Sequence, residues 1–137
     1  MSDTEALDIA QVVTQALIDD AAVSGICAGR VTASYPVAPD QGTVELPRVA
    51  ILFRPGRRLY GSAVRSAVLE VHAVARSSGE AMGLYDACLK ALHAQRHTVT
   101  GVTSSVVFRE TAGVSTRWVE ALRAHSAVGR FTAQSVQ

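Results

Sequence analysis

The sequence predicts an α+β domain in which two helices pack on one face of a four-stranded, mainly antiparallel sheet, with a long loop after the first helix. Two segments carry apolar residues at helical spacing behind a capping pair, and four carry alternating or β-branched residues. Their order along the chain is helix, strand, strand, helix, strand, strand. A length of 137 residues is typical of one domain, so we expect a single domain over residues 1–137.

The first helix is expected to begin at Ser2 and to end near Asp19 and Asp20. Ser2 and Glu5 stand at the spacing of a capping box, and apolar residues then recur every three or four positions, at Leu7, Ala10, Val13 and Leu17. Residues 21–47 contain several Gly and Pro with little periodicity. They are expected to form the long loop, with a short strand over residues 30–34.

A β-hairpin is expected next. Val49, Ile51 and Phe53 alternate with their neighbours, and this run closes at Pro55 and Gly56. A second run follows from about residue 61, with one apolar face formed by Ala67, Leu69, Val71, Ala73 and Ala75. The other face of this second strand carries Ser66, Glu70 and His72. The tip of the hairpin then lies at residues 55–60.

The second helix has a clear beginning and one apolar side. Ser77 and Glu80 form another capping box, and the residues on the apolar side are Ala81, Leu84, Tyr85, Cys88, Leu89 and Leu92. This spacing predicts a helix whose apolar side packs on the sheet.

Two strands complete the predicted sheet. The third follows Arg96, places Val102, Val106 and Phe108 on one face, and is expected to end at Gly113. Residues 117–124 fit a helical turn or a strand. The fourth strand is expected over residues 125–133, with Ala127, Phe131 and Ala133 on one face.

Composition and charge exclude several classes of protein. A net charge of +1 removes the basic excess of a general nucleic-acid binder. Only seven residues are aromatic, so the hydrophobic core must consist mainly of small side chains. Self-association of the chain would add to the stability that such a core provides. Cys27 and Cys88 lack the spacing of a zinc site or a disulfide framework. The start of the chain is polar and acidic, and no apolar run reaches the roughly 20 residues that span a bilayer. We therefore expect a soluble cytoplasmic protein with no membrane contact.

No residue pattern predicts catalysis. His93 and His97 have the i, i+4 spacing of a metal pair, but the intervening residues lack the Glu of an HExxH site, so a structural or solvated role is favoured. His72 and His125 have no evident carboxylate or nucleophile partner in the pattern. No glycine-rich phosphate loop follows a strand. The sequence thus predicts no catalytic residues, no metal site and no cofactor.

The hairpin tip concentrates positive charge. Arg54, Arg57, Arg58 and Tyr60 form a candidate interface, since Arg and Tyr are favoured anchors at protein contacts and Arg also binds phosphates. Tyr35 belongs to a second candidate docking segment in the long loop. In both places a solvated turn or an exposed loop is the alternative interpretation.

The succession of segments resembles the tail terminator (tail completion) proteins of long-tailed bacteriophages, prophages and phage-like gene transfer particles. The residues that carry the resemblance are Ala16–Val31, Leu46–Val49, Leu69–Ala75, Glu80–Leu92, Val106–Glu110 and His125–Ala133. They are patterns of small apolar residues without a catalytic signature. The strand that ends at Ala75 lacks the aromatic residue that many relatives place there, and the tip loop is shorter and richer in Arg.

This resemblance implies a non-enzymatic virion protein, assembled in the host cytoplasm. Such proteins form a hexameric ring on the last ring of the tail-tube protein, stop tube growth and join the tail to the head connector protein. DNA would pass through the ring without sequence-specific binding, which a near-neutral charge suits. A neck or head-completion protein of the head-tail joint is an alternative. A small cytoplasmic binding module or enzyme, with a site built from His72, His125 and the Arg tip, is an alternative from another class.

Overall fold

The computed structural model describes residues 2–33, 45–54, 66–98 and 105–136. Within these residues the chain forms three α-helices, which are α1 (Ser2–Asp19), α2 (Ala21–Cys27) and α3 (Ser78–Leu92). The same residues form six strands and one short 3-10 helix, namely β1 (Val31–Thr32), β2 (Arg48–Arg54), β3 (Ser66–Ala75), β4 (Arg96–Thr98), β5 (Ser105–Val119), η1 (Glu120–Leu122) and β6 (Ala124–Val136).

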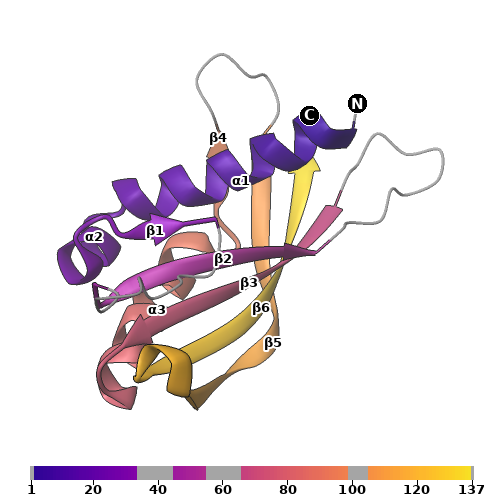
Figure 1. Ribbon diagram of the computed structural model, residues 1–137. Coiled ribbons are helices and arrows are strands. Elements are labelled where there is room, and N and C mark those ends of the chain that lie inside the picture. Colours follow the sequence, from indigo (N-terminus) through magenta and orange to yellow (C-terminus); the bar gives the residue numbers. More distant parts are fainter. Residues whose placement is uncertain (1, 34–44, 55–65, 99–104, 137) are drawn as a thin grey trace.

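The six described strands belong to one mixed sheet in the order β1-β2-β3-β6-β5-β4. β1 runs parallel to β2, and the other neighbouring pairs are antiparallel. α1 contacts both β1 and β4, which are the two edge strands, while α3 packs on the central strands β3 and β6 and on β5. One helix reaches both edges because the sheet curls into a half-barrel, as Figure 1 shows.

The predicted architecture of four strands and two helices is wrong, because the structure adds α2, β1 and β4. β1 lies inside the short strand expected over residues 30–34, but it joins the main sheet by pairing Val31 with Val49. β4 has three residues and pairs Arg96 with Val107. Strands this short have too few residues to show an alternating pattern, so their pairing is decided by the tertiary structure.

The prediction of a loop directly after the first helix is wrong, because residues 21–27 form α2. Oδ1 of Asp20 accepts hydrogen bonds from the backbone N–H groups of Ala22 and Val23, at 3.0 and 3.1 Å, and so caps the helix. Val23 and Cys27, four residues apart, are both fully buried. Gly25 obscured the helix in the sequence because Gly is a weak helix former, and the packing of α2 on α1 and α3 overrides that preference.

The hairpin and the second predicted helix are confirmed. β2 and β3 pair antiparallel, with Ile51 opposite Val71. Oγ of Ser77 accepts the N–H of Glu80 at 3.1 Å, at the start of α3. The buried residues of α3 are those expected except Leu89, which is only partly buried: Ala81, Leu84, Tyr85, Cys88 and Leu92.

The third and fourth predicted strands are longer than expected. β5 passes through Gly113 and ends at Val119, so the prediction that Gly113 ends this strand is wrong. The register with β6 shifts between Glu110 and Ala112 and again between Ala112 and Ser115. These irregularities accommodate the glycine inside a continuous strand. The ambiguous residues 117–124 become the end of β5, η1 and the start of β6.

The core lies between the helices and the apolar face of the sheet, and most of its side chains are small. Its largest fully buried side chains are Tyr85, Phe108 and Phe131. Tyr85 comes from α3 and Phe131 from β6, and their ring centroids are 6.3 Å apart. None of the described helices combines the length and hydropathy that crossing a bilayer requires.

Candidate interaction surface

Of the five residues of the predicted interface, only Arg54 lies among the described residues. Tyr35, Arg57, Arg58 and Tyr60 lie outside the described residues. Arg54 is the last residue of β2, where its backbone is opposite Val68, and its side chain is outside the description. The interface at the hairpin tip therefore stays a prediction.

The His93 and His97 pair does not share a helix, because α3 ends at Leu92. Nδ1 of His93 accepts the N–H of Glu110 at 3.0 Å, so this ring ties the end of α3 to β5. His97 lies in β4, donates from Nε2 to the carbonyl oxygen of Ala91 at 3.0 Å, and stacks at a tilt on Phe108 with 5.7 Å between ring centroids. Each imidazole thus has a structural role. Among the described residues, no group of three or more His, Cys, Asp or Glu side chains is placed to hold a metal ion.

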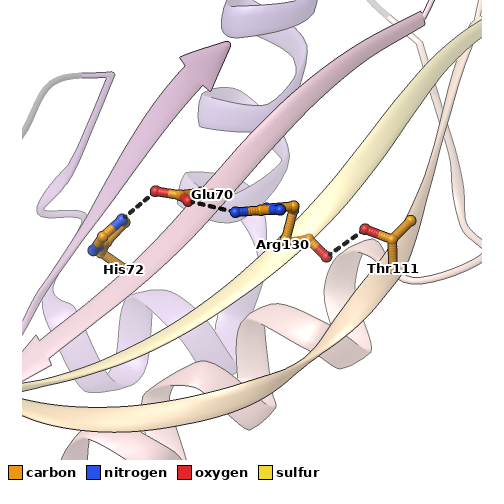
Figure 2. A network of polar contacts seen from close by, with 4 residues as sticks. All are labelled: Glu70, His72, Thr111 and Arg130. Carbon is orange, nitrogen blue, oxygen red and sulfur yellow. Dashed lines mark hydrogen bonds and ion pairs between the residues drawn. The ribbon is translucent and has the colours of Figure 1, made fainter.

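A polar network crosses the sheet on the face opposite the helices, and Figure 2 shows it. The Glu70 carboxylate of β3 lies 3.2 Å from Nε2 of His72 and 3.4 Å from Nη2 of Arg130 on β6. Oγ1 of Thr111 on β5 donates to the carbonyl oxygen of Arg130 at 3.3 Å. The network therefore joins three strands. His72, on the polar face expected for it, is only 2% exposed.

The environment of His72 favours the neutral imidazole. Burial removes water from the ring and lowers its pKa below the usual 6.5, and the positive charge of Arg117 acts in the same direction. The hydrogen bond and the negative charge of Glu70 raise the pKa and offset only part of this effect. His72 is thus a neutral hydrogen-bonding residue of the sheet at neutral pH.

This lowered pKa predicts that the fold weakens in mild acid. Below about pH 6.5 the unfolded chain binds a proton at His72 that the folded chain does not, so the free energy of unfolding falls as the pH falls. Above that pH the stabilisation is fully present. Urea unfolding between about pH 5 and about pH 8 measures this slope. In His72→Gln the slope should be shallower, whatever its stability at neutral pH, and an unchanged slope would contradict the assignment.

Tyr85 and Cys88 on α3 also have structural environments. Oη of Tyr85 donates to Oε2 of Glu110 at 2.5 Å, and Tyr85 is 1% exposed. Burial, followed by Glu110, raises the pKa of the Tyr85 phenol. Burial, followed by Cys27 and Asp20, raises the pKa of the Cys88 thiol. Both groups are held in their protonated forms, which are poor nucleophiles.

Beyond the end of β4, β5 becomes the exposed edge strand of the sheet, while β6 beside it stays paired with β3. We call residues 111–130, which include η1, the β5–β6 ribbon. β4 pairs only with residues 105–107, and in the described part of the chain no strand pairs with the outer edge of residues 111–119. Every residue from 111 to 119 is exposed or half-buried. Open edges of this kind readily bind another chain.

Trp118 stands on this ribbon and is 50% exposed. Its Nε1 donates to Oε2 of Glu120 at 2.6 Å, and its ring meets His125 edge-on, with 5.1 Å between centroids. The indole is therefore held in place while half of it faces solvent. Sequence reasoning missed this surface because residues 117–124 had no clear period, although a single Trp beside Arg117 was a usable signal.

Comparison with solved structures shows a related fold. The chain is similar to a chain in a structure described as the virion of a native gene transfer agent (GTA) particle, with a TM-score of 0.64 and 17% sequence identity. The match covers 91% of this chain and 92% of that chain. Comparison of the sequence with protein-family models and with curated proteins gives no match. At this identity the structural match shows a shared fold.

Proposed function

We propose that this chain is a structural, non-enzymatic protein of a phage-like virion. The observation that supports the proposal most strongly is the fold match to a chain of a gene transfer agent virion, which extends over about nine tenths of both chains. The burial of His72, Tyr85 and Cys88 within the fold is consistent with a structural role for these three titratable residues.

Within the virion, we propose the role of tail terminator. Six copies form a ring on the last ring of tail-tube protein, stop its polymerisation and present a different surface to the head connector protein. A head-to-tail interface, which joins two different surfaces of successive copies, builds a closed ring when the rotation from one copy to the next adds up to one full turn. The net charge of +1 suits a ring that lets DNA pass without retaining it. The resemblance of the sequence segments supports this finer role, and the candidate interface at Arg54, Arg57, Arg58, Tyr60 and Tyr35 belongs to the same proposal.

Tube length tests this function directly. The chain would be co-expressed with the tail-tube protein of the same genome, and the tubes would be measured by negative-stain electron microscopy. We expect short tubes with a cap of six copies at one end, and long uncapped tubes when the chain is omitted. Tubes that grow equally long in both cases would reject the terminator role. If the chain then bound the head connector, it would be a neck or head-completion protein instead.

A further inference from the structure

The charges of the chain are separated along its sequence. Residues 1–29 contain five acidic residues and neither Lys nor Arg: Asp3, Glu5, Asp8, Asp19 and Asp20. Of the 13 basic and 12 acidic residues in the chain, residues 30–137 therefore hold all 13 basic and seven acidic ones. α1 and α2 occupy the acidic segment, and we call them the α1–α2 arm. The arm is thus negative and the rest of the molecule is positive.

The β5–β6 ribbon carries part of this positive charge on arginines that form no ion pair with the described residues. Arg117 and Arg123 are exposed, and the described residues supply no ion-pair partner to either of them. The two glutamates near them bond elsewhere, Glu110 to Tyr85 and Glu120 to Trp118. Arg123 stands at the turn of the ribbon, whereas Arg117 lies on the face of His72, opposite the fixed indole of Trp118.

The arm offers a complementary surface. Asp19 is exposed at the end of α1, and Ile26 of α2 is 37% exposed, one of three large apolar side chains exposed among the described residues. Trp118 on the ribbon is another. Each surface thus combines one exposed apolar side chain with charge of one sign, and the signs are opposite. Buried aromatic residues with Arg are the usual anchors of protein interfaces.

The two surfaces lie on different sides of the molecule. The arm leads directly into β1, the first strand in the sheet order, whereas the ribbon includes β5, on the side of β4. In Figure 1 α1 lies at the top of the molecule, and η1, the gold turn of the ribbon, lies at the bottom. Two unlike, complementary surfaces on different sides of one molecule form a head-to-tail contact, which repeats from copy to copy.

We propose that the β5–β6 ribbon of one copy docks on the α1–α2 arm of a second copy of this chain. Trp118 is the apolar anchor, and Arg123 faces the carboxylate of Asp19. The fixed position of the indole favours this contact, because little side-chain freedom is lost on binding. The inference rests on the proposed function, since it names the surfaces through which copies of a ring protein meet.

Charge-reversal variants of the full chain test the contact, with self-association measured by mass photometry and sedimentation at low and high salt. Arg123→Glu and Asp19→Arg should each raise the dissociation constant of self-association at least about tenfold, as should Trp118→Ala. Lys90→Glu, at an exposed position of α3, is the matched control and should associate like the wild type. Far-ultraviolet circular dichroism and thermal unfolding would show that each variant is folded.

Mixing the variants gives the sharpest result. Arg123→Glu places a carboxylate on the ribbon and Asp19→Arg places a guanidinium on the arm, so an equimolar mixture restores an opposite-charge pair and should associate more tightly than either variant alone. Added salt should weaken the wild-type contact because it screens exposed charges. The inference is overturned if folded Arg123→Glu and Trp118→Ala associate like the wild type, if the mixture associates no more tightly than either variant alone, or if the wild type stays monomeric. Tube capping decides the proposed function separately, whatever these variants do.

Discussion

Gly129→Ala is expected to lower the free energy of unfolding by about 3 kcal/mol or more, although it adds only one methyl group. A Cβ at position 129 would lie 1.7 Å from Oη and 2.3 Å from Cζ of Tyr85, which real structures do not allow. The backbone of β6 cannot retreat easily because it is paired with both β3 and β5. The Tyr85 ring would therefore have to leave its buried site and its hydrogen bond with Glu110.

Two comparisons make this first prediction specific. Gly83→Ala in α3 meets nothing within 4 Å and should be neutral or stabilise the helix by about 0.5 to 1 kcal/mol. In a Tyr85→Leu background, which removes the clashing phenol, Gly129→Ala should lose most of its effect. Urea unfolding of the single and double variants measures this coupling. Equal effects of Gly129→Ala in both backgrounds would show that the strand, and not the tyrosine, resists the methyl group.

Phe131→Ala is expected to destabilise the domain by about 3 to 5 kcal/mol and to lower its melting temperature by roughly 10 to 17 °C. Phe131 is fully buried and lies opposite Leu69 on β3 and Glu110 on β5. Leu69 and Tyr85 lie beside Phe131, but both are themselves buried in the packed core, so neither can move far enough to fill the cavity. The loss should therefore be at the upper end of the range for a core aromatic residue.

Thr132→Ala is the matched control for this second prediction. Thr132 is the next residue of β6, faces the other side of the sheet and is only half-buried. Its replacement should change the free energy of unfolding by less than about 1 kcal/mol. Equal losses at the two positions, measured by thermal and urea unfolding, would mean that the face of β6 is assigned wrongly.

Long segments with a clear period were predictable from the sequence. The capping pair Ser77 and Glu80 and the apolar spacing that follows identified α3, and the alternation around Ile51 and Val71 identified the β2–β3 hairpin. Where the spacing of apolar residues was less regular, the predicted secondary structure was wrong. α2 contains Gly25, β4 has three residues, and β5 continues through Gly113, so all three depend on contacts with distant residues.

The candidate site could be predicted to a smaller extent. The sequence directed attention to the Arg-rich hairpin tip, which lies outside the described residues. It gave no sign that Glu70, His72 and Arg130 meet, because residues 60 positions apart in the chain become neighbours only when β3 pairs with β6. The exposure of Trp118 likewise depends on where β4 stops covering β5.

The sequence by itself determined four properties of this protein. These are a length typical of one domain, a core of small side chains, a near-neutral charge with an acidic first segment, and the helices and strands whose apolar spacing is regular. Local spacing is sufficient for these because side chains three or four apart in a helix, or two apart in a strand, share a face. The tertiary structure alone decided the six-strand order, the curl that brings both sheet edges to α1, and the closeness of Gly129 to Tyr85. Those features arise from contacts between distant segments, where the packing of the whole core, and not the preference of any one segment, sets the geometry.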